Sequence, residues 1–470
     1  MKVEQIYTNC LAQGAYYLES NGEAAIIDPL REVQPYIDLA DSRQAKIKYV
    51  FETHFHADFV SGHVDLARKT GAEIVYGPTD METGFDVTIA RDNQEFKLGD
   101  ITLRVLHTPG HTLESSCFLL IDADGKQTSL FTGDTLFIGD VGRPDLAQKV
   151  VKDLTQEKLA SMMYDSLREK IIPLDDDVIV YPAHGAGSAC GKNMSKETSD
   201  TLGNQKKTNY ALDLTLSRED FVKALISGLA PPPSYFPQNV SMNITGYQNI
   251  DEVVEAGTTP LSVAQFKQLQ ADKKPIILDC RNAEAFGSGF IPGSYNIGID
   301  GSFAVWVGAV LRDVQKPILI VTELGREEET ATRLARVGFD HQLGVLQGGI
   351  EAWKSAGEQL DEIESISPAE LSGVSPDQIL DVRKNSEFES EHIDGATSFP
   401  LDNWWEHLEN IDKSKRQYVH CAGGYRSMAF VSILRSLGFD NLVNVKGGFG
   451  KIKELGEMKL TEFVCPTTKL

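Results

Sequence analysis

The chain has 470 residues and a formal net charge of −23, from 45 Lys and Arg residues against 68 Asp and Glu residues. One hydrophobic core does not grow to this size, so we expect about two to four domains. The negative field repels phosphates, which argues against a general nucleic-acid or anionic-membrane partner. No apolar run of about 18 residues is present, so we expect no membrane span.

Residues 1–7 lack the basic flank and apolar core of a signal peptide. The six cysteines are widely scattered, and none of them forms a Cys-x-x-Cys pair. This pattern argues against a disulfide framework or a structural zinc site and fits a reducing compartment. We therefore expect a cytoplasmic protein.

Short strand-like runs (24–27, 101–106, 117–121 and 178–181) and helical segments (61–69, 154–170 and 218–227) alternate through residues 1–229. The run Ile47–Phe51 predicts a strand that ends before the motif His-x-His-x-Asp. This motif places His54, His56 and Asp58, all metal-ligand types, within five residues. Three later loops carry further side chains of these types, namely His111, Asp134 and His184.

These four loops, in this order, resemble the metallo-β-lactamase superfold. The resemblance implies an αββα sandwich, in which two sheets face each other and helices cover the outside. In the two-metal hydrolases of that fold the first motif ends in a further His, which serves the second metal. Phe59 stands at that position here, and because an apolar ring cannot ligate, we expect one metal rather than two.

A Pro-rich stretch, Pro231–Pro233, follows the first domain. Proline fixes the backbone and removes an amide donor, so we expect residues 230–258 to form an extended surface linker.

Beyond residue 258 the sequence repeats itself. Ile277–Arg281 recurs as Ile379–Arg383, 102 residues later, and Leu346–Gly349 recurs as Val445–Gly448, 99 residues later. Each copy alternates strands with helices, which predicts two small parallel-sheet α/β domains at 259–362 and 363–460, with a tail at 461–470. The Leu-Asp-x-Arg entry and the Gly-Gly ending resemble the rhodanese family.

In the second copy a short strand, 417–420, leads into the loop Cys-x-x-Gly-x-Arg and then a helix. Amide groups and the positive pole of the helix favour a thiolate or persulfide anion on Cys421. Gly423 and Gly424 let the backbone curl around the sulfur, and Arg426 can hold an oxyanion such as sulfite or thiosulfate.

The same loop in the first copy is altered at both chemical positions. An offset of 99 places Thr322 opposite Cys421 and Glu327 opposite Arg426. A hydroxyl cannot carry sulfane sulfur and a carboxylate repels sulfite, so we expect this copy to be catalytically silent.

Together the two halves resemble the bacterial persulfide dioxygenase–rhodanese fusions of sulfide detoxification. The resemblance implies one Fe(II) per chain, held by His54, His111 and Asp134. It places His56, Asp58 and His184 outside the metal shell, where they orient ligands or waters. The residues alone also permit a single-zinc hydrolase that uses His54, His56 and His111.

In that family O₂ converts a low-molecular-weight thiol persulfide to sulfite, and the rhodanese loop then gives thiosulfate. Arg143 becomes a candidate contact for the substrate's carboxylate or phosphate, and Cys190 a candidate sulfur acceptor at the metal site. We expect a homo-oligomer, a dimer or tetramer, while glutathione, coenzyme A and other thiols stay open as carriers.

Two other functions compete with this one. A metal-dependent hydrolase of glutathione thioesters, of the glyoxalase II kind, shares the fold and most motifs, but Phe59 and the rhodanese copies oppose it. An assembly protein that binds partners through its repeats agrees with the silent copy and is opposed by the intact Cys421 loop.

Overall fold

The computed structural model describes residues 1–146, 154–192, 194–229, 231–406 and 408–465. The chain divides into two compact units, one made of residues 1–250 with 335–338 and the other of residues 251–334 with 339–470. In the described part of the chain, no helix combines the length and apolar character needed to cross a bilayer.

The first unit contains two six-stranded mixed sheets. One runs β1 (Lys2–Thr8), β2 (Gln13–Ser20), β3 (Glu23–Ile27), β4 (Lys46–Glu52), β5 (Glu73–Tyr76) and β6 (Thr88–Ile89). The other runs β12 (Asp200–Thr201), β11 (Ile179–Pro182), β10 (Gln127–Gly133), β9 (Ser116–Ile121), β8 (Ile101–His107) and β7 (Glu95–Leu98).

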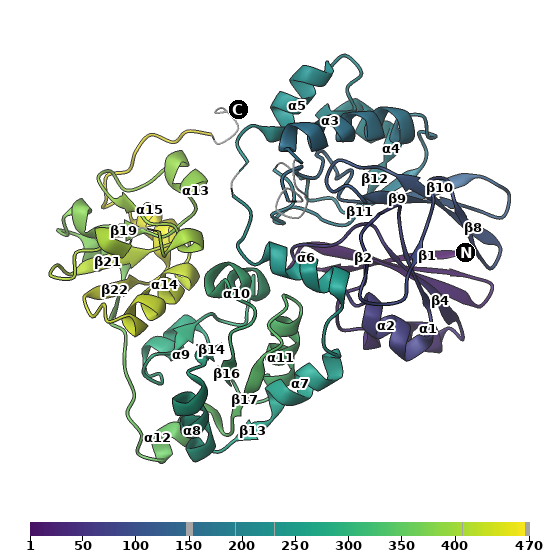
Figure 1. The fold of residues 1–470 in the computed structure, drawn as a ribbon. Coiled ribbons are helices and arrows are strands. Elements are labelled where there is room, and N and C mark those ends of the chain that lie inside the picture. The colour runs from purple at the N-terminus through teal and green to yellow at the C-terminus, as the bar shows by residue number, and fades with distance from the viewer. Residues whose placement is uncertain (147–153, 193, 230, 407, 466–470) are drawn as a thin grey trace. The chain divides into compact units, whose positions relative to one another are not determined.

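Helices cover the outer faces of both sheets, as Figure 1 shows. The first sheet carries α1 (Gln34–Ser42) and α2 (His63–Thr70). The second carries α3 (Gln156–Ser166), which continues as a π-helical turn (Leu167–Ile171), together with α4 (Leu202–Thr208) and α5 (Arg218–Ile226).

The core between the sheets explains this layering. Alternating strand residues such as Phe51 and Phe118 point inward from opposite sheets, and their ring centroids lie 4.9 Å apart. Their neighbours along the strands, such as Val50 and Leu119, point outward and are covered by the helices. Because both faces of each sheet are apolar, the sandwich needs helices on both sides, and the αββα prediction is confirmed.

The prediction of an extended linker is wrong where two helices lie, α6 (Phe236–Thr245) and α7 (Ile250–Thr258). Phe236, Val240 and Ile244 recur at helical spacing, and Pro237 lies in the first turn, where proline is tolerated. Helix α6 belongs to the first unit. The proline signal therefore marked the entry to a helix rather than an extended segment.

The second unit contains two five-stranded parallel sheets with matching strand order, which confirms the predicted pair of small α/β domains. The first is β13 (Pro260–Leu261), β17 (Gln342–Leu346), β16 (Ile318–Val321), β14 (Ile276–Asp279) and β15 (Tyr295–Asn296). The second is β18 (Ser365–Ile366), β22 (Leu442–Val445), β21 (Gln417–His420), β19 (Ile379–Asp381) and β20 (Thr397–Ser398).

Helices connect these strands in both copies. The first copy has α8 (Val263–Lys273), α9 (Ala283–Gly287), α10 (Phe303–Leu311), α11 (Glu327–Ala335) and α12 (Gly349–Ser355). The second has α13 (Asn385–Ser390), α14 (Tyr425–Ser436) and α15 (Gly448–Leu455), and short 3₁₀ turns replace some helices of its twin. Of the predicted tail, residues 466–470 lie outside the described residues.

Candidate metal centre and cysteine loop

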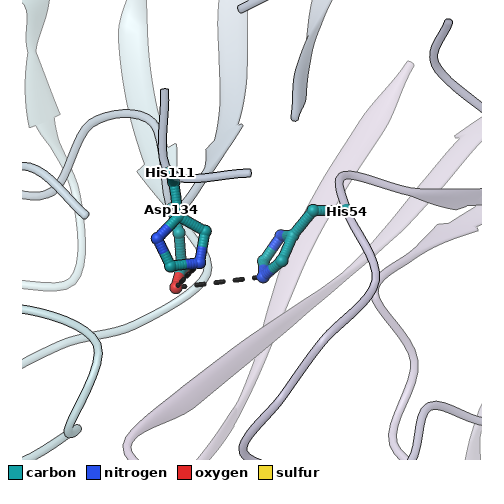
Figure 2. A group of neighbouring side chains, drawn as sticks. All are labelled: His54, His111 and Asp134. Atoms are coloured by element: carbon teal, nitrogen blue, oxygen red, sulfur yellow. Dashed lines mark ion pairs between the residues drawn. The ribbon is translucent and has the colours of Figure 1, made fainter. Parts of the chain in front are cut away.

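Three of the predicted ligands meet at one end of the sandwich, as Figure 2 shows. His54 follows β4, His111 lies between β8 and β9, and Asp134 directly follows β10. The Oδ2 atom of Asp134 lies 3.3 Å from Nε2 of His111 and 3.9 Å from Nε2 of His54. The strands end at this point of the fold. The three side chains therefore lie beyond the hydrogen-bonded part of the sheets, while the strands hold the segments that carry them in place.

Hydrogen bonds orient both imidazoles toward this point. The Nδ1 atom of His111 lies 2.8 Å from the carbonyl oxygen of Arg143, an acceptor that requires the proton on Nδ1. The Nδ1 atom of His54 lies 3.0 Å from Oγ1 of Thr53, which itself donates to Asp28 at 2.9 Å. Both Nε2 atoms are thereby left with lone pairs directed at Asp134.

The electrostatics of the three residues fit a bound cation. Both carboxylate oxygens of Asp134 are buried without a hydrogen-bond partner among the described residues. Burial and the neighbouring His56, His111 and His184 imidazoles hold the pKa of His54 well below its ordinary value, so the ring is neutral. A buried carboxylate without donors is costly, and a metal held by His54, His111 and Asp134 removes that cost.

His56 is not in this group of three. Its Nε2 atom lies 3.1 Å from Oδ1 of Asp28 and 3.5 Å from Oε2 of Glu52. The Phe59 ring packs on it, with centroids 4.4 Å apart. The side-chain amide of Asn243, on α6, donates to the carbonyl oxygens of both His56 and Phe59 and holds this loop.

Asp58 and His184 lie beside the centre. The Nε2 atom of His184 is 3.4 Å from Asp58 and 3.7 Å from Asp134. Burial alone would lower the pKa of His184, but these two carboxylates raise it well above its ordinary value. His56, Asp58 and His184 also place donor atoms within 4.8 Å of one another, so the structure brings together the whole predicted outer group.

Cys190 also reaches the centre. Its thiol shares a cluster within 4.8 Å with Asp134 and His184, and its side chain is buried. Burial, helped by the carboxylates of Asp58 and Asp134, raises the pKa of this thiol to about 12. The geometry suits a group close to the metal, while the sulfur-accepting role stays a prediction.

Arg143 lies in a different setting from the one its predicted role requires. Its guanidinium makes two hydrogen bonds of 2.6 Å to the carboxylate of Asp145 and one of 3.3 Å to the carbonyl oxygen of Ala189. The charge is therefore largely compensated within the loop, and substrate contact stays a prediction.

A cavity of about 530 Å³ opens beside His111. Apolar side chains make up most of its lining, and α6 supplies two of them, Val240 and Ile244. These two side chains belong to the segment that the sequence predicted to be a linker. The i, i+4 spacing of the apolar residues in that segment was the one sign of a helix.

The Cys421 loop has the predicted strand–loop–helix geometry, between β21 and α14. The amide of Gly424 donates to Sγ of Cys421 at 3.1 Å, and the thiol lies 3.7 Å from Oγ of Ser427. Gly424 has φ of +100°, a conformation that favours glycine because it lacks Cβ. The loop thus turns the backbone amide of Gly424 toward the sulfur.

The guanidinium of Arg426 forms an ion pair with the carboxylate of Glu387 on α13. The two side chains form a bidentate pair with distances of 2.6 and 2.9 Å. Burial alone would raise the pKa of Glu387, but the guanidinium of Arg426 holds it below its ordinary value. Trp306, from the first copy, lies 5.7 Å from the same guanidinium. Sequence reasoning missed Glu387, which is 39 residues away.

The corresponding loop of the first copy differs in chemistry. Oγ1 of Thr322 lies 3.2 Å from Oγ1 of Thr330. Two hydrogen-bonded hydroxyls therefore lie where the second copy has the thiol of Cys421. Arg326, one position before Glu327, pairs with Asp300 and Glu329 on its own repeat.

Comparison with known proteins supports this division of the chain. Residues 9–184 match the model of the metallo-beta-lactamase superfamily, and residues 262–356 and 367–455 each match the rhodanese-like domain. A metallo-beta-lactamase structure from Staphylococcus aureus is 32% identical, with a TM-score of 0.64, and the match covers 74% of this chain and 98% of that one.

Two further matches cover a smaller share of the chain. The cytoplasmic hydroxyacylglutathione hydrolase of Arabidopsis thaliana is 33% identical over 37% of this chain, and the chain spans 65% of that relative's length. The structure of ETHE1 from Myxococcus xanthus is 27% identical, with a TM-score of 0.43, and the match covers 52% of this chain and 98% of that one.

Proposed function

The chain belongs to the metallo-beta-lactamase superfamily and carries two rhodanese-like domains, and we propose that it oxidises thiol persulfides with O₂. In this proposal one Fe(II) per chain is held by His54, His111 and Asp134. The second rhodanese copy then transfers sulfur to the sulfite produced.

The position of His56 carries the proposal. With His56 directed at Asp28 and Glu52, one group of converging donors, His54, His111 and Asp134, consists of two imidazoles and one carboxylate. That set suits non-haem Fe(II), which would supply O₂ activation when held by these residues. Zinc is redox-inert and cannot activate O₂.

The protein's own groups have defined roles in this scheme. The Arg143 carbonyl and the Thr53–Asp28 pair fix the two ligand rings, and the cavity beside His111 admits the persulfide while limiting water. The overall step is R–S–SH + O₂ + H₂O → R–SH + SO₃²⁻ + 2H⁺. The S–S bond breaks, the terminal sulfur is oxidised, and O₂ is reduced.

The second step belongs to Cys421. Cys421 first takes the outer sulfur of a second R–S–SH molecule, which leaves as R–SH. Sulfite then attacks the outer sulfur of the Cys421 persulfide, the S–S bond breaks, thiosulfate leaves, and the Cys421 thiol is restored. The loop amide of Gly424, which donates to Sγ of Cys421, stabilises the sulfur anion.

The test is O₂ uptake by iron-containing protein given a small persulfide, with hydrolysis of a glutathione thioester assayed on the same preparation. We expect O₂ consumption with sulfite or thiosulfate as product and no thioester cleavage. Thioester cleavage by a zinc-loaded enzyme, without O₂ uptake, would reject the proposal.

A glutathione thioester hydrolase is the second candidate. The similarity to the Arabidopsis hydroxyacylglutathione hydrolase and the buried His56, Asp58 and His184 group, which could hold another metal, favour it. Phe59, packed on His56, opposes it because it replaces a histidine of the two-metal motif.

A further inference from the structure

The cavity beside His111 has a consistent chemical character. Ten of its described lining residues are apolar, and they come from loops that follow the strands, from α3 and from α6; among them are Phe55, Pro109, Met162, Val240 and Ile244. Such a wall stabilises a ligand by removing its apolar surface from water. A volume of about 530 Å³ accommodates the body of a small thiol as well as its sulfur atoms.

Apart from the imidazoles of His107 and His111, the ionisable side chains among the described lining residues are carboxylates. Asp80 lies at the exposed side, and Glu114 is buried, where it accepts the amide hydrogen of Phe55 at 3.0 Å. Neither lysine nor arginine occurs among the described lining residues. Arg143, the cation expected to meet a substrate carboxylate, is not part of this lining and pairs with Asp145.

Among the described lining residues, a substrate carboxylate would therefore meet carboxylates and no lysine or arginine. Like charges at short range disfavour binding, and a neutral substrate body escapes this penalty. Glutathione carries two carboxylates and one ammonium group, so the body of its persulfide has a net negative charge and matches the wall poorly in both charge and polarity.

We propose that the persulfide carrier has an uncharged, partly apolar body around its sulfur atoms, held by the cavity wall that includes Val240 and Ile244. This inference rests on the proposed persulfide oxidation and specifies the substrate class of that same site. It also explains why α6 belongs to the first unit: the helix supplies part of the wall that receives the substrate.

The test compares two probes on the full-length, iron-containing protein: benzyl hydropersulfide, which is uncharged and apolar, and glutathione persulfide, which carries two carboxylates. O₂ uptake gives kcat/KM for each. We expect the benzyl probe to be preferred by about tenfold or more, as expected when charge and apolar contact act together.

Two variants separate the contributions of charge and apolar contact. Asp80→Lys should raise the ratio of kcat/KM for glutathione persulfide to kcat/KM for the benzyl probe by about three- to tenfold. Asp124→Lys makes the same charge change at an exposed hairpin position outside the cavity lining and should leave this ratio unchanged. Val240→Ser should lower kcat/KM mainly for the benzyl probe, because it removes apolar wall without adding charge.

The possible outcomes are distinct. Preference for glutathione persulfide, or an equal response to Asp80→Lys and Asp124→Lys, would overturn the substrate class while persulfide oxidation stands. Absence of O₂ uptake with either probe, in protein that contains iron, would overturn the proposed function itself.

Discussion

The two rhodanese-like copies share one scaffold and differ in one loop. Both have the same strand order, and in both the carboxylate at the end of the strand pairs with the arginine two residues later, Asp279 with Arg281 and Asp381 with Arg383. Their loops, by contrast, contain Thr322 in one copy and Cys421 in the other. The two copies thus share the ion pair that stabilises the fold, and they differ in the residue that would carry the sulfur.

The difference extends beyond the loop. Arg426 pairs with Glu387 in the second copy. In the first copy Glu327 stands opposite Arg426, and Ala285 stands opposite Glu387, because each lies four residues after the paired arginine of its strand. Both partners of the ion pair are therefore absent from the first copy. This indicates that Glu387 is part of the active loop of the second copy rather than of the shared scaffold.

The change with the largest expected effect is Cys421→Ser. We expect sulfur transfer to fall by about a thousandfold or more, since the atom that carries the sulfur is removed. O₂ uptake should persist, and sulfite should replace thiosulfate as the product, because the metal centre needs no thiol from this loop. Cys280→Ser, in the strand of the silent copy, is the control, and the test fails if thiosulfate output from Cys421→Ser is unchanged after non-enzymatic exchange is subtracted.

The shared ion pairs should respond alike. Asp279→Ala and Asp381→Ala each leave a buried guanidinium partly unpaired, so each should destabilise its copy by about 3–5 kcal/mol, as measured by chemical denaturation. Equal effects in the two copies would support a structural role for the pair in both. A large effect in the active copy alone would show that the pair serves catalysis and not the fold.

Restoring the silent copy should require more than a thiol. In a Cys421→Ser background, Thr322→Cys should give no thiosulfate:cyanide sulfur transfer, while Thr322→Cys with Glu327→Arg should give weak activity. Replacing a repulsive charge by an attractive one changes anion binding by on the order of 4 kcal/mol per contact at an intermediate dielectric. Turnover by the single variant, or by the unmodified copy, would show that the loop's charge is unimportant.

The smallest expected effect comes from Glu387→Gln, which leaves the guanidinium of Arg426 with a neutral partner. We expect KM for thiosulfate to fall about two- to fivefold with kcat nearly unchanged, since the pair is only partly buried. Glu389→Gln on the same helix is the control. A fall in kcat with unchanged KM would mean that Glu387 orients the loop instead of competing with anions.

The Glu387–Arg426 pair also predicts a pH dependence. The folded-state pKa of Glu387 is lowered, so the pair contributes stability above the ordinary glutamate pKa of about 4.3 and loses it as pH falls through the folded value. Wild type should therefore lose stability between about pH 5 and 3 more steeply than Glu387→Gln in the same denaturation assay.

The strand ends that carry His54, His111 and Asp134 could be predicted from the sequence because apolar runs stop directly before them. The same holds for the Cys421 loop, which is continuous in the chain. Glu387 and Asn243 could not be predicted, because each acts on a loop far away in sequence. The prolines before α6 predicted an extended segment and so obscured the helical spacing that follows them. The predicted substrate contact of Arg143 did not include the ion pair that its guanidinium forms with Asp145.

The ligand set is the central claim, and the metal content of two variants tests it most directly. Anaerobically prepared wild type and His56→Ala should each contain about one iron per chain, whereas Asp134→Ala should contain almost none, because it loses one of three protein donors. Retention of metal by Asp134→Ala together with its loss from His56→Ala would contradict the account, as would two tightly bound metals per chain in the wild type.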